Sequence, residues 1–157
     1  MTKTQHPEID EVRYRLRTYL TAHTAHGMLD AQLEPDEHLR AMAVGGYDHG
    51  RGVAALTDRR VLFVQEAVAG GAVRSLPLAE VTSVEYARRG NVGTVTVRTA
   101  RSCHQLYRAA ILDGRGLAEA IQAVLDARRA AEAAEAARLA EEEALTEGEE
   151  LEEASAG

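Results

Sequence analysis

Two short runs, separated by residues 65–74, constrain the fold of this chain more than any other feature. The first reads Leu-Thr-Asp-Arg-Arg-Val-Leu-Phe-Val over residues 56–64, and the second reads Ser-Leu-Pro-Leu-Ala-Glu-Val-Thr-Ser-Val over residues 75–84. Thr57 and Asp58 favour a tight turn, because their side chains bond nearby backbone amides. Pro77 has no amide hydrogen and therefore belongs at a strand edge or a bend. Together the two runs predict a small antiparallel β domain.

The region from about residue 36 to residue 105 has the pattern of several short strands. Apolar residues recur with a period of two or in short blocks, and glycine pairs separate them. Such spacing indicates an all-β barrel or sandwich. The strands are predicted near residues 38–47, 51–57, 60–66, 72–78, 81–88, 92–99 and 102–108.

Helices are predicted on both sides of the strands. Residues 7–30 carry apolar side chains at three- and four-residue spacing, with Gly27 as a stop and a short helical turn after it. A second helix is predicted from Asp113 to Arg128, with an apolar stripe that closes one end of the β domain. The resulting organisation is an N-terminal helical extension at 1–32, a β domain with its helix at 33–128, and a tail at 129–157.

The charge of the chain is concentrated in the tail. Ten Glu and one Arg give residues 130–157 a net charge of −9, which leaves +2 for residues 1–129 out of a total of −7. Alanine and glutamate are strong helix formers, so the tail can extend the preceding helix, with fraying near Gly148. The tail is either a solvated helix or a surface that packs on a copy of itself or on a basic partner.

The order of seven strands and one amphipathic helix, together with the two runs, resembles the bacterial pleckstrin-homology-like (PH-like) domains, a group related to the GRAM domains. The run at 56–63 resembles the first signature of that family, the run at 75–84 the second, and residues 93–97 the strand that follows. The resemblance covers about residues 33–128. It implies a mainly β fold, a seven-stranded antiparallel barrel capped by a C-terminal helix, and a tendency to form oligomers. The N-terminal helix and the Ala/Glu-rich tail lie outside the family core.

Two sets of residues are candidates for binding. An apolar helix face must be buried on the chain's own barrel, on the C-terminal helix or on another subunit, and it comprises Ile9, Val12, Leu16, Tyr19 and Leu20. A set of barrel arginines is either a contact for anionic lipid or a solubilising surface, and it comprises Arg51, Arg59, Arg60, Arg74, Arg88 and Arg89. Phosphoinositide-binding members of the PH superfamily carry many basic residues between the first two strands, whereas residues 47–51 here offer only Arg51 and Asp48 as charged groups.

No catalytic, cofactor or metal site is expected from the spacing of reactive residues. His23 and His26 lack nearby ligands in the usual pattern, and Cys103 and His104 are neighbours in a strand, so their side chains point apart. We therefore expect a non-enzymatic interaction module that acts as a scaffold or adaptor, either as a homo-oligomer or with a protein partner. The alternative is peripheral binding of anionic membrane lipid, whereas nucleic acid is not expected as a partner. The single cysteine and the charged N-terminal region favour the cytoplasm, with membrane contact only in the lipid-binding alternative.

Overall fold

A computed structural model of the chain describes residues 6–15, 23–66 and 71–157. Seven antiparallel strands form a half-barrel sheet: β1 (Leu39–Tyr47), β2 (Gly50–Thr57), β3 (Arg60–Gln65), β4 (Val73–Pro77), β5 (Val81–Arg89), β6 (Val92–Thr99) and β7 (Cys103–Ala110). Their order across the sheet is β4-β3-β2-β1-β7-β6-β5. The predicted mainly β fold with seven antiparallel strands and a C-terminal helix is confirmed.

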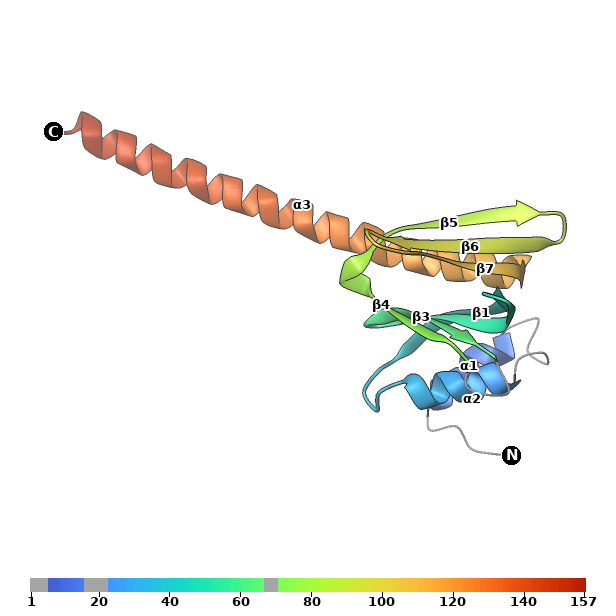
Figure 1. Cartoon of the computed structure of the whole chain (residues 1–157). Coiled ribbons are helices and arrows are strands. Elements are labelled where there is room, and N and C mark those ends of the chain that lie inside the picture. The colour runs from blue at the N-terminus through green and yellow to red at the C-terminus, as the bar shows by residue number, and fades with distance from the viewer. Residues whose placement is uncertain (1–5, 16–22, 67–70) are drawn as a thin grey trace. The chain divides into compact units, whose positions relative to one another are not determined.

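The sheet bends at the join between β1 and β7. Gly46 and Tyr107 form the single register pair between these two strands, whereas β1 and β2 pair along almost their whole length. As a result, β1–β4 and β5–β7 form two separate layers (Figure 1). The strands at the two ends of the sheet order, β4 and β5, are joined by the short 3-10 helix η1 (Leu78–Glu80).

In the layer formed by β1–β4, both faces are buried along β2 and β3, whereas β4 is largely exposed. One face packs against α1 (Pro7–Arg15) and α2 (His23–Gln32), which lie on the side away from β5–β7 (Figure 1). The other face points into the half-barrel. Along β2 and β3 the residues from Gly52 to Thr57 and from Val61 to Val64 are all buried, the pattern of a strand covered on both sides.

Two apolar clusters follow from this layering. The outer cluster joins the helices to the sheet, and it comprises Ile9, Leu29, Leu33, Leu39, Met42, Val44, Val53, Ala55, Leu62 and Val64. The alternate residues of β2 and β3 face the interior, together with buried residues of β6, β7 and the start of the last helix, among them Phe63, Val95, Leu106, Leu117 and Ile121. Each such side chain contributes about 1.5–3 kcal/mol by its burial.

The N-terminal region differs from the single helix ending at Gly27 that the sequence predicts. The described residues of this region form α1 and α2, and Gly27 lies inside α2. A glycine within a helix costs about 1 kcal/mol relative to alanine. Leu29 and Leu33 follow directly and are buried against the sheet. The free energy gained by burying these two leucines exceeds the cost of the glycine, so the helix continues through Gly27.

The last helix, α3 (Ile111–Ser155), is also longer than expected, because it continues through Gly148 without a break. The chain divides into two compact units, residues 1–122 and residues 123–157, and the boundary between them falls within α3. Within the second unit, Arg138 forms ion pairs with Glu135 at 2.8 Å and with Glu142 at 3.5 Å. Pairs at this spacing each add a few tenths of a kcal/mol to a helix. Within the part of the chain described here, no helix combines the length and the apolar character that crossing a membrane requires.

Candidate functional site

The turn between β2 and β3 is a polar cluster that ties the barrel to the segment after α2. The Thr57 hydroxyl oxygen accepts hydrogen bonds from the backbone amides of Arg59 and Arg60, which confirms that Thr57 shapes the turn. The Asp58 carboxylate accepts a hydrogen bond from the amide of His38 at 3.0 Å. The run at residues 56–64 therefore fixes the turn and also holds the start of β1.

A buried carboxylate lies at the centre of this cluster. Glu37 accepts hydrogen bonds from the hydroxyl of Thr57 at 2.7 Å and from two nitrogens of Arg60 at 2.8 and 2.7 Å. The amide of Glu34 donates a further bond at 3.1 Å. Burial alone would raise the pKa of Glu37, but the hydrogen bonds from Arg60, Thr57 and Glu34 outweigh it and lower this pKa to about 2. Glu37 is thus a buried anion with a complete set of donors.

This cluster occupies two of the six candidate arginines. Arg60 pairs with Glu37, and Arg59 pairs with Glu34 at 2.9 Å and with Asp36 at 2.6 Å. Adjacent strand residues are expected to point to opposite faces, yet both guanidinium groups reach residues 34–37. The difference arises because Arg59 lies in the turn rather than in a strand. Their role in this structure is to hold the α2–β1 connection on the barrel.

The other four candidate arginines are distributed over separate elements. Arg51 lies on β2, Arg74 on β4, and Arg88 and Arg89 at the end of β5, and all four are exposed. Arg88 donates a hydrogen bond to the carbonyl of Gly90 in the β5–β6 turn. Of the six arginines, only Arg74 lines the pocket described next.

The predicted apolar helix face is described in part. Ile9 is buried in the outer cluster, and Val12 packs against that cluster, so both contact the chain's own barrel. Leu16, Tyr19 and Leu20 lie outside the described residues. Of the three locations that the sequence allows for this face, the barrel is the one observed for Ile9 and Val12.

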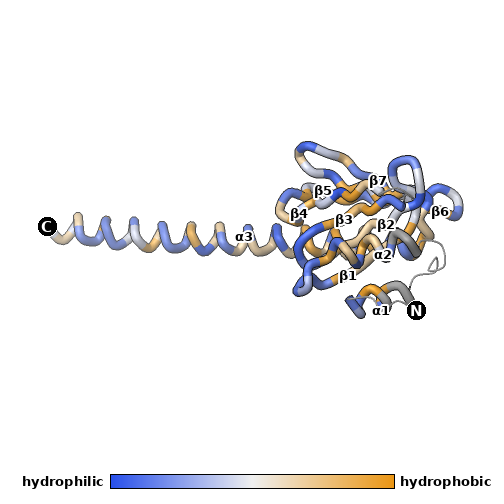
Figure 2. Tube along the Cα trace, turned by 60° about the horizontal axis from the view of Figure 1, so that its bottom comes forward, coloured by the Kyte–Doolittle hydropathy of each residue, from blue (hydrophilic) through white to orange (hydrophobic). Residues whose placement is uncertain are grey.

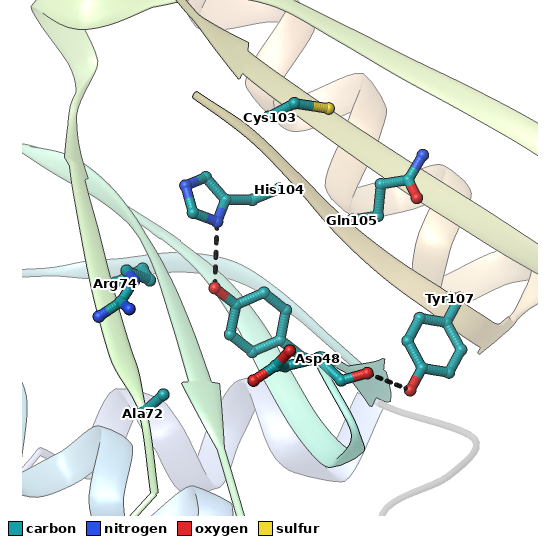
Figure 3. Close-up of a pocket in the computed structure, with 8 residues that line it drawn as sticks. Asp48, Ala72, Arg74, Cys103, His104, Gln105 and Tyr107 are labelled. Atoms are coloured by element: carbon teal, nitrogen blue, oxygen red, sulfur yellow. Dashed lines mark hydrogen bonds between the residues drawn. The ribbon is translucent and has the colours of Figure 1, made fainter. Parts of the chain in front are cut away.

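An open pocket of about 510 Å³ lies where the β1–β2 turn, β4 and β7 meet. Figure 3 shows the residues that line it, namely Tyr47, Asp48, Ala72, Arg74, Cys103, His104, Gln105 and Tyr107. Its volume falls in the range of small-molecule sites, about 300–1,000 Å³. This pocket is not among the sites predicted from the sequence, although the period of two in β7 places His104 on the same side as the buried Leu106.

Two of the lining residues, Tyr47 and His104, belong to an aromatic cluster with the buried Phe63. The ring of Tyr47 packs on Phe63 with centroids 5.1 Å apart, and Phe63 packs on His104 at 5.5 Å. The Tyr47 hydroxyl and His104 Nδ1 are hydrogen bonded at 3.0 Å (Figure 3). Burial raises the pKa of Tyr47, so this hydroxyl stays protonated. Burial, and then the nearby positive charge of Arg74, lower the pKa of His104, so the imidazole is neutral at about pH 7.

Two further contacts position the rim of the pocket. The Tyr107 hydroxyl donates a hydrogen bond to the carbonyl of Asp48 at 2.9 Å, and Asp48 has a left-handed backbone with a φ of 57°. A Cβ on Gly46 would overlap the Tyr107 ring, so only glycine lets this ring lie against β1. Cys103 is exposed and accepts a hydrogen bond from Arg98 at 3.4 Å, away from the face on which His104 lies.

Comparison of the chain with protein-family models and with curated proteins finds no match.

Proposed function

We propose that this chain is a non-enzymatic, PH-like interaction module that acts as a scaffold or adaptor through protein–protein contacts and assembles with copies of itself. The two signature runs and the order of seven strands followed by a helix support the PH-like assignment. The observation that best supports protein–protein contacts is the exposed C-terminal part of α3.

Residues 129–157 are all exposed, and those up to Ser155 are helical. Leu139, Leu145 and Leu151 are 48, 71 and 72% exposed in this segment. Figure 2 shows a largely hydrophilic helix with short apolar stretches along it. At 1.5 Å per residue this segment presents roughly 40 Å of helix surface. Because an isolated helix has little tertiary packing to stabilise it, a partner that covers the leucines would add stability.

The charges indicate which surfaces meet in an assembly. Two tails side by side would bring two net charges of −9 together, and this repulsion disfavours tail–tail contact. Residues 1–129 carry +2, with exposed arginines on β2, β4 and β5. We therefore propose that the tail of one copy contacts the barrel of another. Such contact is weakened by salt.

Size-exclusion chromatography with light scattering tests this proposal. At low ionic strength and high protein concentration, we expect a mass that is a multiple of the 17.0 kDa chain and that falls as salt is added. The double variant Leu145→Gln, Leu151→Gln should reduce assembly. Leu112→Gln is the matched control, because Leu112 is 52% exposed but lies outside the tail. A single-chain mass under all conditions would rule out self-assembly.

Binding of anionic lipid through barrel arginines is the alternative. The exposed pair Arg88 and Arg89 at the end of β5 favours it, whereas the ion pairs of Arg59 and Arg60 reduce the number of available charges. Co-sedimentation with phosphatidylserine vesicles should then be salt-sensitive and weaker in Arg88→Gln, Arg89→Gln. Equal sedimentation with neutral phosphatidylcholine vesicles would contradict this alternative.

A further inference from the structure

The pocket between β4 and β7 brings two hydrogen-bond donors together. Arg74 lies on the wall of this pocket, and its sequence neighbours in β4, Val73 and Ser75, are not acidic. Its guanidinium donates one long hydrogen bond, 3.4 Å, to the carbonyl of Val73. Among the residues that the structure describes, no carboxylate forms an ion pair with it. Arg74 therefore has most of its five N–H donors available to a ligand.

His104 supplies the second donor. The ring is neutral, and its Nδ1 is hydrogen bonded to the protonated Tyr47 hydroxyl. When Tyr47 donates this bond, the ring hydrogen lies on Nε2. Nε2 is the nitrogen that points away from Tyr47 (Figure 3). Arg74 from β4 and His104 from β7 both line this pocket.

We propose that this pocket binds a singly charged carboxylate, which the Arg74 guanidinium holds through two hydrogen bonds and to which His104 Nε2–H donates a third. A planar guanidinium matches a carboxylate in this geometry. The aromatic rings of Tyr47 and Tyr107 give the pocket apolar walls for the remainder of a small organic acid.

The charge balance favours a carboxylate over a phosphate. Arg74 is the one cation among the lining residues, and the same lining includes the negative charge of Asp48, which lies 3.5 Å from His49. A phosphate monoester carries about −1.5 to −2 at pH 7, which a lining with one arginine and one aspartate does not balance. Recognition of an anionic membrane surface usually involves a cluster of about 4–8 basic residues, which this lining lacks.

Binding has a specific consequence for His104. Of the titratable and charged groups that share the pocket lining with His104, Tyr47 and Asp48 come from β1 and its turn, Arg74 from β4 and Tyr107 from β7, whereas the Cys103 side chain points to the opposite face of β7. A bound carboxylate offsets the charge of Arg74 and adds a negative charge beside the ring. Both changes favour the imidazolium, so the pKa of His104 rises on binding.

Proton NMR of the full chain, titrated with sodium acetate at constant ionic strength, tests the proposal. His104 is assigned by the signal lost in His104→Gln. We expect a saturable shift of the His104 signal and a higher pKa with acetate. Affinity should fall about tenfold or more in Arg74→Gln and stay unchanged in Arg101→Gln, an exposed arginine outside the pocket.

Three results would overturn it: no saturable shift, an equal shift in Arg74→Gln, or tighter binding of inorganic phosphate than of acetate. A shift with phosphatidylserine vesicles but not with acetate would likewise overturn it and indicate lipid. The titration is done at a protein concentration where light scattering gives a single chain. Its outcome is therefore independent of self-assembly.

Discussion

Replacing the buried Glu37 by glutamine should destabilise the protein in a pH-dependent way. Glutamine keeps the shape of the side chain but removes the charge that Arg60 and Thr57 stabilise. The pKa of Glu37 is about 2 instead of 4.5, and each pKa unit corresponds to about 1.4 kcal/mol. The carboxylate therefore contributes about 3 kcal/mol to the free energy of unfolding at pH 7. Glu37→Gln should lose about this amount.

The sign of the pH dependence follows from the lowered pKa. The contribution of Glu37 is complete above a pH of about 4.5 and is lost as the pH falls towards about 2. At pH 3 roughly 1.5 kcal/mol of it should remain, so the difference between the native chain and Glu37→Gln should fall to about half. Below a pH of about 2 Glu37 is protonated in the folded chain as well, so the native chain and Glu37→Gln should there be nearly equal in stability.

Urea unfolding followed by near-ultraviolet circular dichroism measures this difference at pH 7, 5 and 3. The near-ultraviolet signal is preferred because the exposed tail helix would dominate a far-ultraviolet signal. Glu34→Gln is the matched control, because the Glu34 side chain is 64% exposed and its pair with Arg59 is worth at most about 1 kcal/mol. An equal loss in the two variants, or a loss in Glu37→Gln that does not change with pH, would refute the reasoning.

Three further substitutions test the packing of the barrel and its helices. Leu29→Ala should cost about 2–5 kcal/mol in urea unfolding, because Leu29 is fully buried between α2 and the sheet; no measurable loss would mean that α2 does not pack there. Gly46→Ala should cost about 1–3 kcal/mol, because the new methyl group displaces the Tyr107 ring, and an unchanged midpoint would contradict that contact. The hydrogen bond to Glu8 raises the pKa of His38, so NMR titration of Glu8→Gln should show the pKa of His38 falling towards 6.5. The stabilisation from this pair is present below pH 6.5 and is lost as the pH rises through the raised pKa of His38.

The strands could be predicted from the sequence to within two residues at either end. Their local signals are strong, because glycine turns separate the apolar runs and the side-chain period is two. Gly90, for example, has a φ of 63° in the β5–β6 turn, a conformation that suits glycine. The turn at Thr57 could be predicted for the same reason, since its hydrogen bonds are to adjacent amides.

Contacts between distant residues could not be predicted in this way. The role of Arg60 depends on Glu37, which is 23 residues away in the sequence. Tyr47 and His104 are 57 residues apart, and nothing local to either residue indicates their hydrogen bond. The pocket therefore appears only when β1 and β7 are brought together.

A further signal in the sequence indicates that β2 and β3 are covered on both faces. The runs of β2 and β3 are apolar at consecutive positions, as in Val61-Leu62-Phe63-Val64, and such runs indicate a strand covered on both faces. This pattern predicts a layer outside the barrel, which α1 and α2 supply. It would also have placed the apolar side chain of Ile9 on the chain's own sheet.

Amide hydrogen exchange of the tail, followed by mass spectrometry, tests the proposed assembly most directly. The exchange of residues 129–155 is compared at a low protein concentration, where the chain is single, and at a high concentration and low salt. Contact between the tail and the barrel of another copy predicts slower exchange in the tail at high concentration, and a return to the fast rate when salt is added. Equal exchange of the tail under all three conditions would contradict the proposal that it is the contact surface.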